Sequence, residues 1–190
     1  MQLEAFSISG LKKITPVRFN DDRGYFSEVF KKEWFCQNVA EVDFVQDNES
    51  LSAVAGTVRG LHFQSEPFAQ AKLVRCVQGR LMDVAVDIRS GSPTFGKWTS
   101  VELSALNGEQ LWIPQGFAHG FMTLEDNTII SYKVSANYNA DHDRGIRWND
   151  PAIGIRWPDT KTLVMSRKDM LHPLLSELPE YFTYTGTGNC

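Results

Sequence analysis

The sequence lacks paired cysteines, a long apolar run and a cluster of basic residues. Its three cysteines (Cys36, Cys76 and Cys190) have neither the number nor the spacing of a disulfide framework or a metal-binding motif. We therefore expect reduced thiols in a cytoplasmic protein. No apolar run reaches the roughly eighteen residues that a membrane-spanning helix needs, so no membrane partner is expected. Residues 1–10 also lack the basic start and apolar core of a signal peptide.

The charge balance is mildly acidic, with 19 Lys and Arg residues against 23 Asp and Glu residues and a net charge of −4. This balance argues against a general nucleic-acid partner, because no basic cluster offsets it. An anionic ligand would have to be bound by a few well-placed arginines and lysines. The length of 190 residues is enough for one sizeable core, and no repeat or linker interrupts it. We expect one domain over residues 1–190.

Short strands with turn signals between them dominate the middle of the chain. Apolar residues at positions 82, 84, 86 and 88 alternate with other residues in RLMDVAVDIR, which is the period of a β-strand. Gln78-Gly79 and Glu125-Asp126-Asn127 predict two hairpins. Short helices are predicted over residues 31–39 and 170–178. The pattern is typical of an all-β fold, a β-sandwich or barrel, with short N- and C-terminal helices, and a jelly roll suits the length best.

The two ends of the chain are expected to be additions to this fold. Residues 1–50 would supply extra strands that cover a sheet edge or cross to a second subunit, since exposed edges need protection. Residues 160–190 would form a C-terminal helical segment.

Several longer motifs then give the chain a resemblance to a known family. These motifs, in chain order, are DDRGYFSEVF, QDNES, RGLHFQ, KLVRCVQGRLMDVAVDIRSGSPTFGKW, IPQGFAHGF, YKVSANYNADHDRGIRWNDPAIGIRWP and SRKD. Their order resembles that of the dTDP-4-dehydrorhamnose 3,5-epimerases, over roughly residues 2–185. The resemblance implies a cupin-type jelly roll, a homodimer that exchanges N-terminal strands, no metal or other cofactor, and a dTDP-4-keto-6-deoxyhexose substrate. Phe63 and Asp143 stand where the family often has Tyr and Glu.

The implied chemistry needs a base, an acid and a group that holds an enolate oxygen. Protons at C3 and C5 of such a sugar flank the C4 ketone, so removal of either gives an enolate. The resemblance implies that His62 is the base and Tyr132 the acid on the opposite face of the sugar. It assigns Lys72 to the enolate oxygen. Taken alone, each of the three would be read as an ordinary core or surface residue.

Asp169 has two interpretations from sequence. With Ser166 it resembles a helix capping box ahead of an apolar run. The resemblance implies instead that its carboxylate accepts a hydrogen bond from His62 and fixes the imidazole tautomer. The two roles do not exclude each other.

The resemblance also implies a set of substrate-binding residues. His119 would orient the sugar or its ketone, and Tyr138 would lie over the sugar. The remaining residues would contact the nucleotide part, where an arginine suits a diphosphate because its guanidinium donates two parallel hydrogen bonds. They are Arg23, Glu28, Gln46, Asn48, Arg59, Asp143 and Lys168.

Gly60 decides whether Arg59 and His62 can serve one site. The two are three residues apart, and an odd separation in a regular strand sends side chains to opposite faces. Glycine within a strand often marks a bulge, where one extra residue shifts this alternation. We predict a bulge at Gly60 that turns both side chains toward one interior.

A metal is not expected, although many cupins bind one. Residues 108–119 match the second cupin motif and end in His119. The first motif should supply two histidines separated by one residue, but here it reads His62-Phe63-Gln64. At most two histidines remain at these positions, fewer than the three protein ligands of a catalytic zinc or iron site.

Other functions on the same scaffold remain open. A 3-epimerase, a 5-epimerase or a sugar 3,4-ketoisomerase would share the histidine base and differ in where the enolate is reprotonated. A sugar-nucleotide-binding cupin without activity should lack the acid or the base, yet candidates for both are present. A metal-dependent dioxygenase is not expected, because the cupin positions of this chain offer fewer than three metal ligands.

Overall fold

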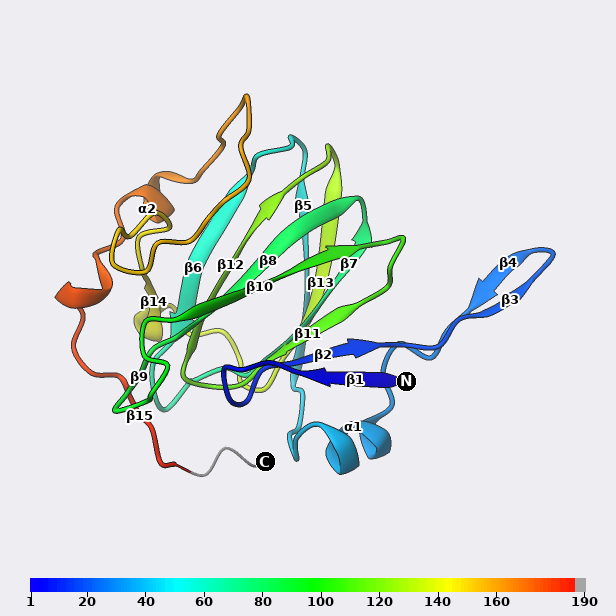
Figure 1. The fold of residues 1–190 in the computed structure, drawn as a ribbon, viewed down its shortest axis with the longest axis horizontal. Helices are drawn as coiled ribbons and strands as arrows, with labels where there is room; N and C mark the ends of the chain where they lie inside the picture. Colours follow the sequence, from blue (N-terminus) through cyan, green and yellow to red (C-terminus); the bar gives the residue numbers. More distant parts are fainter. Residues whose placement is uncertain (187–190) are drawn as a thin grey trace.

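Two antiparallel sheets form the body of the protein in a computed structural model, which describes residues 1–186 (Figure 1). The larger sheet has six strands in the order β1-β2-β11-β7-β13-β5. Its strands are β1 (Gln2–Ala5), β2 (Lys12–Thr15), β5 (Gln46–Ser52), β7 (Lys72–Gln78), β11 (Gln110–Ile113) and β13 (Thr128–Val134). The first two strands extend an edge of this sheet, because β2 pairs with β11 and β1 pairs with β2.

The smaller sheet has five strands in the order β10-β8-β12-β6-β14. They are β6 (Val58–Gln64), β8 (Arg80–Asp87), β10 (Trp98–Ser104), β12 (Phe117–Thr123) and β14 (Asp143–Gly145). A core that takes side chains from β7, β11 and β13 of one sheet and from β8, β10 and β12 of the other lies between the two. This arrangement confirms the predicted β-sandwich of jelly-roll type.

The remaining elements are short. β3 (Phe19–Asp21) and β4 (Gly24–Phe26) form a hairpin that projects from the body, and β9 (Arg89–Ser90) pairs in parallel with β15 (Phe182–Thr183). The α-helices are α1 (Lys32–Asn38) and α2 (Arg167–Met170), and the 3-10 helices are η1 (Ala140–His142) and η2 (Leu175–Glu177). No helix in residues 1–186 combines the length and apolar character needed to span a bilayer.

Both faces of β8 are buried, so the alternation seen in its sequence does not separate a core face from a solvent face. Val84 and Val86 pack in a cluster with Trp157 and Leu175 of the C-terminal segment. On the other face, Ala85 joins the core between the sheets. Asp83 is fully buried as well, so the polar positions of this strand face the interior and not the solvent.

The two predicted hairpins are wrong. The turn at Gly79 joins β7 of the larger sheet to β8 of the smaller one, and the turn at residues 125–127 likewise joins β12 to β13. Both turns are tight, with φ of +74° at Gly79 and +54° at Asn127. The sequence predicts a tight turn at each position, but it does not distinguish a turn within one sheet from a turn that connects two sheets.

The helical predictions hold at one end of the chain only. α1 lies within the predicted segment 31–39. The predicted helix over 170–178 is broken: α2 ends at Met170 and one 3-10 turn follows at residues 175–177. Pro173 lies between them, and proline lacks the N–H that a continuing helix requires. Cys36 and Cys76 are free thiols, whereas Cys190 lies outside the described residues.

Candidate active site

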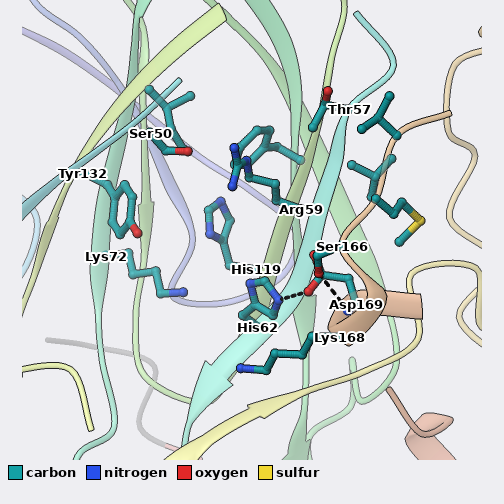
Figure 2. Close-up of a pocket in the computed structure, with 15 residues that line it drawn as sticks. Ser50, Thr57, Arg59, His62, Lys72, His119, Tyr132, Ser166, Lys168 and Asp169 are labelled. Carbon is teal, nitrogen blue, oxygen red and sulfur yellow. Dashed lines mark hydrogen bonds and ion pairs between the residues drawn. The ribbon is translucent and has the colours of Figure 1, made fainter. Parts of the chain in front are cut away.

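A cavity of about 470 Å³ is lined by all four predicted catalytic residues (Figure 2). The five-stranded sheet contributes His62 and His119 to its lining, and the six-stranded sheet contributes Lys72 and Tyr132. Asp169 enters from α2, which lies beside β6. Arg59 and Lys168 complete the predicted residues of this lining. His62 and Asp169, which are 107 positions apart in the chain, are thus brought into one site.

A second cavity of about 180 Å³ shares His62, Lys72 and Tyr132 with the first. It adds four of the predicted substrate-binding residues, which are Gln46, Asn48, Tyr138 and Asp143. The two cavities therefore meet at the catalytic candidates. This gives room for a ligand with two parts, one on each side of His62.

The bulge predicted at Gly60 is confirmed by the strand register. Between β12 and β6, His119 pairs with His62 and Phe121 with Arg59, so three steps on β6 oppose two on β12. Gly60 has φ of +120°, and a Cβ at this position would lie 2.6 Å from the Cα of Gly120. Only glycine suits that conformation and that approach. As a result Arg59 and His62 line the same cavity.

His62 and Asp169 form a hydrogen-bonded pair. Nε2 of His62 lies 2.8 Å from Oδ1 of Asp169. Since a carboxylate only accepts, Nε2 is the donor, and in the neutral ring Nδ1 then has the free lone pair. The other carboxylate oxygen accepts the backbone N–H of Gly60 at 3.1 Å. Burial acts to raise the pKa of Asp169, but the contacts with His62, Gly60 and Ser166 lower it to about 2.

Asp169 also takes part in a helix cap. Its backbone N–H donates to Oγ of Ser166 at the start of α2. The side chain does not complete a capping box, because it extends to His62 instead. The capping-box interpretation therefore holds only for the bond to Ser166, whereas the carboxylate pairs with His62 as the resemblance implied.

A second histidine–carboxylate pair, which the sequence reasoning missed in part, lies beside the first. Nε2 of His119 lies 2.8 Å from Oδ1 of Asp83. Burial lowers the pKa of His119, and the charge of Asp83 opposes this. Asp83 was not a predicted site residue. The sequence did contain a signal for Asp83, because an aspartate in a strand otherwise rich in valine needs a buried partner.

Lys72 and Tyr132 are polar groups on the side of the cavity opposite His62 and Asp169 (Figure 2). Lys72 is 8% exposed. Burial lowers the pKa of its ammonium to about 8, although the charges of Asp143 and Asp83 act to raise it. Burial also raises the pKa of the Tyr132 phenol, so this side chain keeps its proton at neutral pH.

A polar network lines the outer part of the site. Nζ of Lys168 lies 2.5 Å from Oδ2 of Asp143, and the hydroxyl of Tyr138 donates to the same oxygen at 3.1 Å. The charge of Asp143 raises the pKa of Tyr138. On the other rim, Arg59 donates to Oγ of Ser52. Charged groups of both signs therefore border the opening.

Arg23 and Glu28 are the two predicted residues that the chain does not bring to either cavity. Arg23 lies in the projecting β3–β4 hairpin, where its side chain is 91% exposed and pairs with Asp21. Glu28 follows the hairpin and is exposed.

Three side chains within residues 1–186 present donor atoms close enough to share a metal ion. They are His62, Asp169 and His172. This set differs from the cupin positions considered from sequence, where His119 was the candidate partner of His62. His172 was not singled out at all.

Comparisons with known proteins agree on one family. The sequence model described as dTDP-4-dehydrorhamnose 3,5-epimerase matches residues 5–177. The dTDP-4-dehydrorhamnose 3,5-epimerase of Sinorhizobium fredii is 64% identical over 184 residues, which are 97% of this chain and 94% of the relative.

Solved structures show the same likeness. A crystal structure of the dTDP-6-deoxy-D-glucose-3,5-epimerase of Legionella pneumophila, in complex with dTDP-4-keto-L-rhamnose, has a TM-score of 0.94 at 40% identity and covers 97% of this chain and 98% of its own. A 3'-monoepimerase of Streptomyces bikiniensis, in complex with dTDP-quinovose, has a TM-score of 0.85 at 35% identity, covering 90% and 86%.

Proposed function

This chain belongs to the dTDP-4-dehydrorhamnose 3,5-epimerase family, and we propose that it inverts C3 and C5 of a dTDP-linked 4-keto-6-deoxyhexose in deoxysugar biosynthesis. One observation carries the proposal: His62 and Tyr132 reach the same cavity from opposite sheets. Inversion of a carbon centre needs proton removal on one face and proton delivery on the other. Two sheets that face each other across a sugar meet this need.

In the proposed reaction His62 removes the first proton. Its Nδ1 has the free lone pair, since Nε2 donates to Asp169. The proton taken from C3 or C5 makes an imidazolium, which the ionised carboxylate of Asp169 stabilises, as the third member of a catalytic triad does. Asp169 thereby acts on the base and does not need to touch the sugar.

The electron pair left by the proton moves to the C4 oxygen and forms an enolate. Lys72 is buried in the cavity wall, and an ammonium group in a place of low polarity strongly stabilises a growing negative charge. Tyr132 then delivers its phenolic proton to the carbon from the other side. The resulting phenolate lies on the same sheet as Lys72 and across the cavity from His62. Before the second centre reacts, the phenolate regains a proton from solvent and the imidazolium of His62 loses one to solvent.

The residues of the outer rim are proposed to bind the rest of the substrate. Arg59 is assigned to the diphosphate, while Gln46, Asn48, Asp143 and Lys168 border the path to the nucleotide. His119, held by Asp83, would orient the sugar, and Tyr138 would cover it. No metal or other cofactor is assigned to the reaction.

The experiment that tests this function follows deuterium in the substrate. The protein is incubated with dTDP-4-keto-6-deoxyglucose in D₂O, and C3 and C5 are monitored by NMR. Exchange and inversion at both carbons support the proposal. If the sugar binds but neither carbon exchanges, the chain is a sugar-nucleotide-binding protein and the proposed chemistry is wrong.

Inversion at one carbon is the second candidate function. The likeness to a 3'-monoepimerase, at a TM-score of 0.85, is the observation that favours it. Deuterium and inversion at C3 alone would establish it. A product in which the keto group has moved to C3 would indicate a 3,4-ketoisomerase instead.

We further propose that the chain forms one domain and works as a cytoplasmic homodimer in which N-terminal segments are exchanged. Two observations support exchange: Arg23 is remote from its own cavity, and Phe19 and Phe26 beside it are 59% and 66% exposed. Apolar rings on a projecting hairpin are typical of a surface that a partner covers. The free thiols of Cys36 and Cys76 suit a reducing compartment.

Mixed dimers test the exchange. A chain with Arg23→Ala and a chain with His62→Ala are each impaired, but a heterodimer of the two has one site with both side chains if Arg23 acts in the partner's site. Activity should therefore recover on mixing and subunit exchange, at substrate concentrations below KM. If Arg23 serves its own chain, no site in the mixture has both, and no activity returns.

A further inference from the structure

His172 lies beside the pair of His62 and Asp169 and has no part in the proposed mechanism. It follows α2 in the chain, and only 8% of its surface is exposed. The centroids of the His172 and His62 rings are 5.5 Å apart, with an angle of 78° between the ring planes. A second imidazole therefore meets the edge of the catalytic one.

Gly145 makes room for this ring. It pairs with His62 across β14 and β6, and a Cβ at residue 145 would lie 2.3 Å from Nε2 of His172. Within residues 1–186, Nε2 of His172 has no hydrogen-bond partner although it is buried. A buried polar atom without a partner is unfavourable, which makes this atom ready for a ligand.

Three donor atoms converge at this point. Oδ1 of Asp169 lies 2.8 Å from Nε2 of His62 and 3.8 Å from Nε2 of His172. All three atoms lie within 4.8 Å of one another. Ligands around a tetrahedral zinc ion, each about 2.0–2.1 Å from it, are about 3.4 Å apart. The two distances to the carboxylate bracket this value, so small side-chain rotations would place the three donors around one ion.

We propose that His62, Asp169 and His172 form an inhibitory binding site for a divalent transition-metal ion of the Zn²⁺ class. Two imidazoles and a carboxylate are a ligand set that Zn²⁺ favours. His62 is the most accessible of the three, with 33% of its side chain exposed against 6% for Asp169 and 10% for His172. The ion therefore enters from the cavity and keeps its fourth position there for water.

Inhibition follows from the tautomer of His62. Nε2 carries the proton in the pair with Asp169. A metal ion on Nε2 needs the lone pair of that atom, so the proton must move to Nδ1 and the ring can no longer accept a proton from the sugar. This consequence rests on the proposed role of His62. The binding of the ion does not.

A Co²⁺ titration tests the binding, because tetrahedral Co²⁺ absorbs visible light and is displaced by Zn²⁺. The full chain, stripped with a chelator and dialysed, should bind one ion with such a spectrum. His172→Leu should weaken binding at least ~10-fold, since even loss of an outer-shell partner has that effect. His142→Leu, which removes a histidine outside the cluster, should bind as the unmodified protein does. His172→Gln replaces the leucine variant if that variant fails to fold.

An inhibition assay tests the consequence. Zn²⁺ should abolish epimerisation by the unmodified protein, whereas His172→Leu should keep its metal-free rate and need at least ~10-fold more Zn²⁺ for the same inhibition. Equal Zn²⁺ affinity of the unmodified and His172→Leu proteins, or no one-to-one Co²⁺ complex, would overturn the site. One-to-one binding without inhibition would overturn the inhibitory role. Absence of epimerisation in metal-free protein would instead count against the proposed function, while the Co²⁺ spectra would still decide the site.

Discussion

Nε2 of His62 lies 2.8 Å from Oδ1 of Asp169, although 107 residues separate the two in the chain. The second carboxylate oxygen accepts the backbone N–H of Gly60, two residues before His62. The carboxylate is therefore held by the same strand that carries His62. Ser166 fixes the backbone of Asp169 at the start of α2, because its Oγ accepts the N–H of Asp169.

The first prediction removes either member of this pair. His62→Ala should lower kcat at least ~10²-fold, the typical contribution of general base catalysis. Asp169→Asn should also lower kcat, because an amide can hold the imidazole in the wrong tautomer. Steady-state kinetics with the dTDP-linked substrate measure both. Asp159→Asn, which alters an exposed carboxylate nearby in sequence, should have no effect, and full activity of Asp169→Asn would refute the role of Asp169.

The second prediction concerns Lys72 and stability. The buried ammonium has its pKa lowered to about 8, from 10.5 in an unfolded chain. Between these values the unfolded state binds more protons than the folded state, so the stability contribution of Lys72 rises with pH. Below pH 8 the buried charge costs on the order of 3 kcal/mol.

Lys72→Met should accordingly be more stable than the unmodified protein at pH 7 while losing most of its activity. The stability difference should shrink as the pH rises from 8 to 10.5. Urea unfolding at pH 7 and pH 10 measures it, with the exposed Lys161→Met as the control. A variant that is less stable at pH 7 would contradict the prediction.

The third prediction separates binding from chemistry. Arg59→Ala should mainly raise KM, because a diphosphate contact is equally strong in the ground state and the transition state. The loss should be roughly 1.5–3 kcal/mol, the range for a hydrogen bond to a charged group. Arg156→Ala, at an exposed arginine, is the matched control. An unchanged KM for Arg59→Ala would place the diphosphate elsewhere.

The fourth prediction separates proton removal from proton delivery. Tyr132→Phe keeps the ring and its packing but deletes the hydroxyl. His62 is untouched, so the enolate should still form and take deuterium back on the original face. The variant should therefore exchange deuterium faster than it inverts configuration, as NMR in D₂O would show. Inversion at the normal rate would mean that water or Tyr138 is the acid.

The fifth prediction concerns the bulge at Gly60. Gly60→Ala should destabilise the fold, because a Cβ there would lie 2.6 Å from the Cα of Gly120 and φ is +120°. Gly91→Ala introduces a Cβ at φ of +78° with no atom within 4 Å, so it isolates the backbone strain, about 1–3 kcal/mol. Thermal unfolding should show a larger loss for Gly60→Ala. Equal losses would mean that the close approach to Gly120 has no energetic role.

The sequence was sufficient to predict the structure where a local pattern is compatible with only one local structure. The alternation in residues 80–89 predicted β8, and a glycine between Arg59 and His62 predicted the bulge, because strand parity is a local property. Turns at Gly79 and residues 125–127 were predicted in place, but not the sheets that they join. Which strands become neighbours depends on long-range packing, and a tight turn carries no information on it.

Only the site residues that lie in recognisable sequence motifs were predicted. His62, Lys72 and Tyr132 lie together as the resemblance implied, whereas Asp83 and His172 were missed because their partners are distant in sequence. Pairing of Asp83 with His119 and of His172 with the His62–Asp169 pair exists only in three dimensions. Arg23 is the opposite case: it lies in a predicted motif, but its side chain is exposed to solvent in the single chain.

The origin of His62 and Tyr132 in different sheets has a consequence for how substrate range can change. The clearance between His62 and Tyr132 depends on the spacing of the two sheets, about 10 Å in packed sandwiches, and core side chains such as Val74, Leu81 and Ala85 pack between them. An enlarged or reduced core residue would therefore alter which sugar ring fits between the two groups, without any change in the cavity wall. Substrate selection in this fold can thus evolve from its hydrophobic interior.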